Sequence, residues 1–355
     1  MPCGVFKTSY AEDMAFIKWP IHRIALVFTL AFLAAYPFVF RNDIYMLYWA
    51  NYIAIFLIAT LGINILTGYA GQISLGHGAF MAIGAYASTI TAIKLGLPFP
   101  LTTFVGAISS MLFGLIFGIP SLRLKGFYLA IATLAAQYLV DFLLVNPKLT
   151  WLTGGSAGLV VPEAKLFGFA ITKVPNSDFY FYFVAVPLAV FFFVFAANLT
   201  RSDVGRAWVA IRDNDIAAEI MGINVFKYKL LAFAIASFYA GVAGSLWAYY
   251  VGYLTPEHYT IALSIDFVAM ILIGGLGRHW GSLIGTVFVL TLPEILKRAI
   301  IPAISGYVPM TFTVESLRPI IFGAIIILFL IAEPHGIVEL LRKVKEYLRL
   351  FPFPY

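Results

Sequence analysis

Residues 199–229 read LTRSDVGRAWVAIRDNDIAAEIMGINVFKYK. They form the one long charged interruption in a chain of 355 residues, of which only 11% are Asp, Glu, Lys or Arg. Apolar runs flank the stretch at 179–199 and 228–252. A helix needs about twenty apolar residues to cross the hydrocarbon core of a membrane. The stretch therefore predicts two membrane-spanning helices joined by a charged segment that lies in water.

The rest of the chain repeats this pattern of apolar runs and short polar breaks. Hydrophobic residues make up 62% of it and the mean hydropathy is +0.93, values far from those of soluble proteins. No window of ~100 residues is polar enough for a soluble domain. We predict a single all-α polytopic membrane domain over residues 1–355, with about ten transmembrane helices. The predicted spans are 22–40, 44–67, 79–95, 100–119, 127–145, 179–199, 228–252, 263–276, 281–299 and 317–332.

The distribution of basic residues predicts the orientation. If the N-terminus lies inside, most of the 23 Lys and Arg residues fall in cytoplasmic segments, as the positive-inside rule requires. Both termini and the loop at 200–227 are then cytoplasmic, and the Pro- and Gly-rich segment 146–178 is an external loop. Residues 336–350 alternate apolar and basic side chains at helical spacing, which predicts an amphipathic helix lying on the inner leaflet.

The sequence lacks the motifs of common catalytic centres. It has no Gly-x-x-x-x-Gly-Lys-Ser/Thr phosphate loop, and its five histidines are isolated from one another. The lone Cys3 excludes intrachain disulfides. Residues 154–158 read GGSAG and match the nucleophile elbow of hydrolases, but no strand is expected before them. We therefore expect no enzymatic activity, no catalytic residue, no cofactor and no metal.

Two glycine-dense interruptions separate apolar runs, the first at 67–78 and the second at 274–285. Non-helical backbone at membrane depth must have its polar groups satisfied by protein or by a watery cavity, so broken helices tend to mark a pathway. The polar side chains beside the first interruption are predicted to line a substrate path: Gln72, Ser74 and His77. The alternatives are an ordinary cytoplasmic turn for the segment and a hydrogen-bonded packing role for the histidine.

The charged loop contains a short predicted helix at 216–221. Residues 213–215 are good N-cap residues, and Gly222 is a natural C-terminal stop. The apolar face of this helix is too small for a domain core and suits insertion into a cleft on a partner. That face is formed by Ile216, Ile220 and Met221.

An ion-coupled secondary transporter is the alternative from another class. The carboxylates closest to membrane depth are Asp141, Asp266 and Glu294. An intramembrane carboxylate is a functional candidate, but all three fall near the ends of predicted spans, where a charged head can reach water. Such a transporter would need coupling carboxylates well inside its spans and no docking loop, so the sequence disfavours it.

Several segments, in the same order along the chain, resemble the permeases of branched-chain amino acid ABC transporters of the LivM type. The resemblance covers roughly residues 45–300. Its motifs are GYAGQISLGHGAF (68–80), LRLKGFYLA (122–130), TGGSAGL (153–159), GRAWVAIRDNDIAAEIMGIN (205–224), YKLLAF (228–233), AGVAG (240–244) and GGLG (274–277).

The resemblance implies a permease subunit of an ATP-driven importer in the cell (inner) membrane. Such permeases pair with a second related permease and two cytoplasmic ATP-binding-cassette subunits, and an external binding protein delivers the substrate. The default substrates are leucine, isoleucine and valine, although relatives carry urea, short amides or other amino acids. By this resemblance the residues that couple the permease to the ATPase are Arg206, Arg212, Asp213, Ile216, Glu219, Ile220 and Gly222. Ile216 and Ile220 would fill the ATPase groove, with charged contacts around them.

Overall fold

The computed structural model describes residues 20–41, 43–121, 126–166, 168–295, 323–324, 326–329, 331, 333 and 336–350. The chain divides into two compact units, Met1–Trp49 and Ala50–Tyr355. In the first unit, helix α2 (Pro20–Val39) is followed by the start of α3 (Ile44–Ile63). The Tyr36 hydroxyl donates to the Met46 carbonyl at 3.3 Å and joins the two helices.

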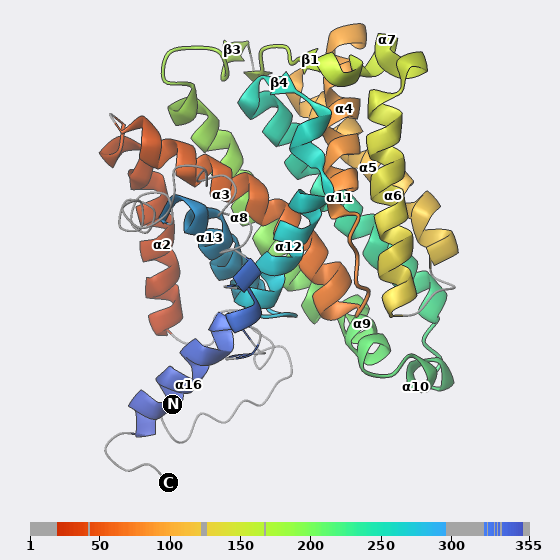
Figure 1. Ribbon diagram of the computed structural model, residues 1–355. Helices are drawn as coiled ribbons and strands as arrows, with labels where there is room; N and C mark the ends of the chain where they lie inside the picture. Colours follow the sequence, from red (N-terminus) through yellow and green to blue (C-terminus); the bar gives the residue numbers. More distant parts are fainter. Residues whose placement is uncertain are drawn as a thin grey trace, which may run out of the picture. The chain divides into compact units, whose positions relative to one another are not determined.

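The second unit is built almost entirely of helices (Figure 1). After α3 come the π-helical turn η1 (Asn64–Tyr69), α4 (His77–Leu95), α5 (Phe99–Ser121), α6 (Phe127–Val145), α8 (Ser177–Arg201), α9 (Asp203–Asp213), α10 (Asp215–Ile220), α11 (Val225–Val251), α12 (Ile261–Gly274), α13 (His279–Ile295) and α16 (Ile337–Leu350). The short elements are η2 (Pro147–Leu149), α7 (Thr150–Thr153), η3 (Gly155–Ala157), β1 (Leu159–Val160), β2 (Lys165–Leu166), β3 (Phe169–Ala170), β4 (Tyr253–Leu254) and η4 (Pro256–Tyr259).

Helices of membrane-spanning length and polarity dominate the described chain. Seven are long and apolar enough to cross a bilayer: 44–69, 77–95, 99–120, 127–145, 177–201, 225–251 and 256–274. Each of the first nine predicted spans falls on a helix as far as its residues are described, although α2 and α13 do not meet the length and polarity required of those seven, and residues 296–299 of the ninth lie outside the described residues. The predicted span at 317–332 lies mostly outside the described residues. The predicted class, an α-helical polytopic membrane protein, is confirmed.

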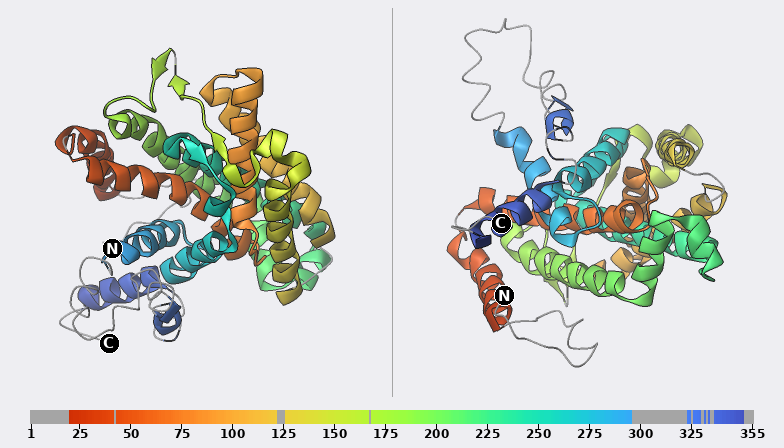
Figure 2. Two further views of the ribbon diagram at one scale, coloured as in Figure 1. Left: turned by 45° about the horizontal axis from the view of Figure 1, so that its top comes forward. Right: turned by 90° about the horizontal axis from the view of Figure 1, so that it is seen from below.

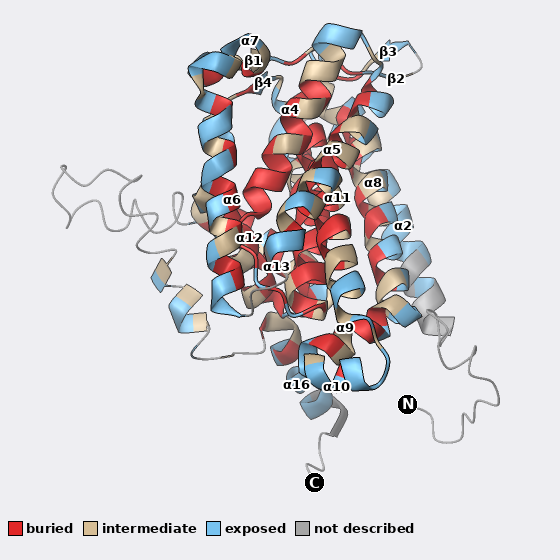
Figure 3. Cartoon of the chain, turned by 90° about the vertical axis from the view of Figure 1, so that its right-hand side faces the viewer, coloured by how far each residue is buried: buried red, intermediate tan, exposed pale blue. Residues whose placement is uncertain are grey.

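The core of the second unit is a bundle of α4, α5 and α11, which pack closely against one another (Figure 2). Glycines bring the backbones together, because a Cβ atom on Gly84 would lie 2.3 Å from the Gly241 Cα atom and one on Gly244 would lie 1.9 Å from the Met81 carbonyl. Close approach of small residues is the usual way helices associate where water cannot drive packing. Many buried residues therefore lie along α4 and α11 (Figure 3), and the span formed by α3 and η1 is buried to an even greater extent.

The two ends of the second unit differ. At one end, the segment between α6 and α8 folds into short helices and strands, and β1 pairs antiparallel with β4, with Leu159 opposite Leu254. Strands β2 and β3 form a second antiparallel pair. At the other end lie α9 and α10 (Figure 1). The segment predicted to be an external loop and the charged loop thus occupy opposite ends of the bundle.

Candidate functional site

The charged loop folds into two helices that meet at Asn214. This residue is extended (φ −160°, ψ 107°), and its side-chain oxygen accepts hydrogen bonds from the backbone N–H groups of Ile216 and Ala217 at 3.1 and 3.0 Å. It is therefore the N-cap of α10. Gly222 follows α10 with φ +85°, a left-handed conformation that a side chain disfavours. The short helix, Asp215–Ile220, thus lies within one residue of the range 216–221 that the sequence predicted.

Helix α9 precedes this cap and was not expected from the sequence. Its inner face buries Ala207, Trp208 and Ile211, and the Trp208 indole N–H donates to the Tyr228 carbonyl at 2.8 Å. The spacing of these three apolar residues fits one face of a helix, and that periodicity was the signal that could have revealed α9. The indole bond fixes α9 to the first turn of α11.

Helix α10 and its C-cap residue Met221 present three apolar side chains outward. Ile216, Ile220 and Met221 are 62%, 80% and 81% exposed, whereas Ala218 on the inner side is buried. We call the three exposed residues the apolar knob. Glu219 lies exposed beside it, and Arg206 on α9 pairs with Asp203. Clustered exposed apolar side chains of this kind mark interaction sites.

Arg212, at the end of α9, connects the charged loop to the first interruption. One guanidinium nitrogen donates to the Gly68 carbonyl at 2.9 Å, and two others donate to an Asp213 carboxylate oxygen at 3.1 and 3.0 Å. Gly71 (φ +67°) lies against the same side chain, because a Cβ atom there would be 2.7 Å from the Arg212 Cγ atom. Arg212 is therefore engaged by its own chain at the base of the broken helix.

The second glycine-dense interruption contacts the chain beside Gly68. The side-chain oxygen of Asn64 accepts a hydrogen bond from the Gly277 N–H at 2.9 Å, and its amide nitrogen donates to the Arg278 carbonyl at 3.2 Å. A Cβ atom on Gly68 would lie 2.5 Å from the Gly277 nitrogen, so only glycine allows this approach. We call Asn64, Gly68, Gly71, Arg212 and Gly277 the glycine junction. Sequence reasoning missed Asn64, although an asparagine within a predicted span is itself an unusual feature.

An ion pair joins helix α16 to the second glycine-dense interruption. Glu339, whose side chain is only 8% exposed, pairs with Arg278 at 2.5 Å and accepts a hydrogen bond from the Arg342 Nε atom at 3.0 Å. These two arginines lower the pKa of the Glu339 carboxyl to about 2, with the bonds from Arg342 as the larger cause. The predicted helix at 336–350 is thus present, and its position on a membrane surface stays a prediction.

The three predicted path residues lie on or beside the non-helical backbone at 70–76, and all are buried. His77 donates from Nε2 to the Ala59 carbonyl at 2.9 Å, a contact that fits the alternative of a hydrogen-bonded packing role. Its Nδ1 atom has no partner among the described residues. The Ser74 hydroxyl accepts a hydrogen bond from the Gly76 N–H at 3.3 Å. Neither polar atom of the Gln72 amide has a partner in the described part of the chain.

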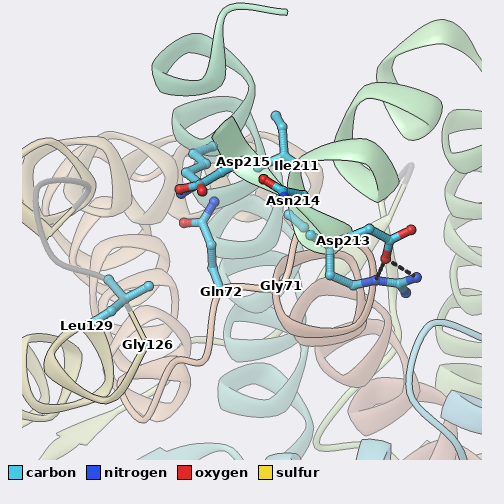
Figure 4. Close-up of a pocket in the computed structure, with 11 residues that line it drawn as sticks. Gly71, Gln72, Gly126, Leu129, Ile211, Asp213, Asn214 and Asp215 are labelled. Atoms are coloured by element: carbon cyan, nitrogen blue, oxygen red, sulfur yellow. Dashed lines mark hydrogen bonds and ion pairs between the residues drawn. The ribbon is translucent and has the colours of Figure 1, made fainter. Parts of the chain in front are cut away.

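A pocket of about 330 Å³ lies where the first interruption faces the turn between α9 and α10 (Figure 4). Its lining residues are Ala70, Gly71, Gln72, Gly126, Leu129, Ile211, Arg212, Asp213, Asn214, Asp215 and Lys229. In Figure 4 the Gln72 side chain reaches from the loop toward Asp215. The Lys229 ammonium and an Asp215 carboxylate oxygen are 3.6 Å apart on this wall.

A second set of polar contacts joins α4, α6 and α12. The Gly78 N–H donates to the Ser264 hydroxyl at 2.8 Å, and that hydroxyl donates to the Gln137 side chain at 3.1 Å. The Gln137 amide nitrogen donates to Asp141 at 3.1 Å, so this carboxylate is held within its own helix. In the described ranges, no group of three or more His, Cys, Asp or Glu side chains could hold a metal ion.

Comparison with known proteins identifies the family. The family model described as branched-chain amino acid transport system / permease component matches residues 45–330. The chain belongs to this family. The permease is 30% identical to the high-affinity branched-chain amino acid transport system permease protein LivM of Salmonella typhimurium, over 94% of this chain and 78% of that protein. No solved structure matches it.

Two Escherichia coli relatives extend the comparison. LivM of that organism is 29% identical over 94% of the permease and 78% of its own length, and LivH, a permease protein of the same named system, is 26% identical over 80% and 91%. The predicted resemblance is therefore confirmed. The permease is a multi-pass membrane protein of a transport family whose members are permease components of ABC-type branched-chain amino acid systems.

Proposed function

We propose that this chain is the membrane-spanning subunit of an importer for branched-chain amino acids and that separate cytoplasmic ATPase subunits drive it through helix α10. The observation that carries the proposal is the apolar knob held at the edge of the glycine junction. Ile216, Ile220 and Met221 are exposed on a helix with both ends capped, and such a rigid apolar patch matches a groove on a partner. Glu219 and Arg206 supply charge at its rim.

Movement of the knob has a direct path into the membrane domain. Arg212 lies in the last turn of α9, two residues before the Asn214 cap, and its bond to the Gly68 carbonyl reaches the broken helix. Trp208 ties the same helix to α11. A partner that shifts α10 would therefore displace the first interruption and α11 together. Because residues 70–76 are not helical, they can change conformation without breaking a helical ladder.

The same movement of residues 70–76 would reposition the predicted path residues. Gln72 and Ser74 lie within the non-helical segment and His77 begins α4, so displacement of the segment changes what these side chains face. Alternating access then corresponds to two arrangements of this segment, whose populations the ATPase subunits shift. In this proposal Arg212 and Asp213 act within the permease, and Gly222 lets the chain turn away after α10.

The remaining partners follow from the relatives. LivM and LivH of Escherichia coli are both permease proteins of one high-affinity branched-chain amino acid transport system, which supports a second, related permease subunit beside this chain. Two ATPase subunits and an external substrate-binding protein complete the assembly. The protein would lie in the inner membrane with both termini cytoplasmic, as its basic residues favour. Other amino acids, urea and short amides are the alternative cargoes.

The experiment removes the knob. In membrane vesicles that contain the cognate ATPase and second permease subunits, with the binding protein added, the double variant Ile220→Ser, Met221→Ser should lose ATPase retention and leucine uptake. Phe169→Ser is the matched control, since Phe169 is 79% exposed at the opposite end of the second unit. Full retention of the ATPase on the double variant would contradict the docking assignment. Uptake of urea or acetamide in place of leucine would contradict the assigned cargo.

A further inference from the structure

The pocket beside the glycine junction has the features of a binding site. Its volume of about 330 Å³ lies within the ~300–1,000 Å³ range of small-molecule sites. Gln72 is only 2% exposed, and neither its amide nitrogen nor its amide oxygen has a hydrogen-bond partner among the described residues. Leaving an amide buried and unpaired is unfavourable, so a molecule in the pocket that pairs with both atoms is expected.

The charged side chains on the same wall indicate which charged groups the ligand carries. Lys229 and Asp215 form an ion pair at 3.6 Å on the pocket wall, and their side chains are 15% and 26% exposed. Arg212 is held by Gly68 and Asp213. Lys229 supplies a cation and Asp215 an anion, and the neighbouring Gln72 amide offers one donor and one acceptor. Together these groups complement a ligand that carries both charges.

Two aliphatic side chains also line the pocket, among mostly polar neighbours. Leu129 at the start of α6 and Ile211 on α9 line the pocket on either side of the Gln72 side chain (Figure 4). Aliphatic side chains in a pocket favour an aliphatic group on the ligand. The ion pair and the two branched apolar side chains together fit an amphiphilic zwitterion.

We propose that this pocket binds an aliphatic α-amino acid. Its carboxylate lies by the Gln72 amide nitrogen and Lys229, its ammonium by the Gln72 oxygen and Asp215, and its side chain against Leu129 and Ile211. The proposal rests on the proposed function for its location on the cytoplasmic side and for the identity of the ligand as the transported amino acid. The pocket touches α9, α10, α11 and the first interruption, so the bound ligand favours the arrangement described here.

The test uses the full-length permease in detergent micelles with a single reporter cysteine. Because Cys3 is the only cysteine, Cys3→Ser with Leu129→Cys places one thiol in the pocket wall. L-Leucine should slow its reaction with a methanethiosulfonate reagent at least ~10-fold at saturation. Leucinamide, which lacks the carboxylate, and 4-methylpentanoate, which lacks the ammonium, should protect far less. Glu219→Cys, exposed outside the pocket, is the control whose rate leucine should leave unchanged.

The substitution Gln72→Leu tests whether the Gln72 amide binds the charged groups of the ligand. It keeps a side chain of similar size and should raise the leucine concentration needed for protection roughly 10-fold or more, since each lost bond involves a charged partner. Ile211→Cys is a second reporter on another element if the first variant does not fold. Equal protection by leucinamide, or protection unaffected by Gln72→Leu, would overturn the proposal. Leucine uptake by the assembled transporter without protection would refute this site alone, whereas absent leucine uptake would refute the proposed function.

Discussion

Replacing Arg212 by methionine tests whether its guanidinium carries movement from α10 to the broken helix. Methionine keeps the aliphatic stem that lies against Gly71, where a Cβ atom would be 2.7 Å from the Arg212 Cγ atom. It removes the 2.9 Å bond to the Gly68 carbonyl and the two bonds to Asp213. The variant therefore separates the loss of these bonds from the loss of packing.

The structure sets the size of the effect. The bond to Gly68 has a charged donor and is worth about 1.5–3 kcal/mol. The pair with Asp213 contributes at most ~1 kcal/mol, because the two side chains are 38% and 63% exposed. If the Gly68 bond transmits the movement, its loss should lower the amino acid transported per ATP hydrolysed roughly 10- to 150-fold.

The assay measures uptake and ATP hydrolysis together in vesicles that hold the assembled transporter. Arg212→Met should continue to bind the ATPase through the intact knob, so hydrolysis persists while uptake falls. Lys165→Met is the control, because it removes an exposed cation paired with Glu163 at 3.6 Å at the opposite end of the second unit. An unchanged ratio of uptake to hydrolysis in a folded Arg212→Met permease would refute the transmission path.

Three further results are expected. Asn214→Ala removes the cap of α10 and should cost about 1 kcal/mol, seen as roughly fivefold faster amide exchange in that helix, whereas Asn214→Asp should restore protection. Gly71→Ala would force a side chain into a φ of +67° against Arg212 and should lower stability by about 1–3 kcal/mol, measured by thermal unfolding in detergent; a neutral effect would show that the contact is not tight. The pKa of Glu339 is lowered from 4.5 to about 2, so its ion pairs stabilise α16 above pH 4.5, and this stabilisation is lost as the pH falls toward 2. The unfolding midpoint should drop over that window, and Glu339→Gln should flatten the dependence.

The sequence alone determined the features that depend on local chemistry. Runs of apolar residues gave the α-helical membrane class, because their length matches the bilayer and their backbone must be satisfied within each helix. The N-cap candidates at 213–215 and the stop at Gly222 located α10 to within one residue at each end, since a cap acts on N–H groups two or three residues away, and the structure selected Asn214 as the cap. Motifs in a fixed order identified the family over most of the chain.

Only the tertiary structure decided how these parts meet. Gly68 and Gly277 were each visible as part of a glycine-dense interruption, but their approach depends on the packing of helices far apart in the chain. The same holds for Arg212, which the family resemblance predicts at the ATPase interface and whose guanidinium donates to the Gly68 carbonyl in the fold. A side chain's partners across 144 residues leave no local signal, because they are set by how several helices pack at once. The pocket and the unpaired Gln72 amide in its wall likewise depend on how several helices pack, so the sequence did not reveal them.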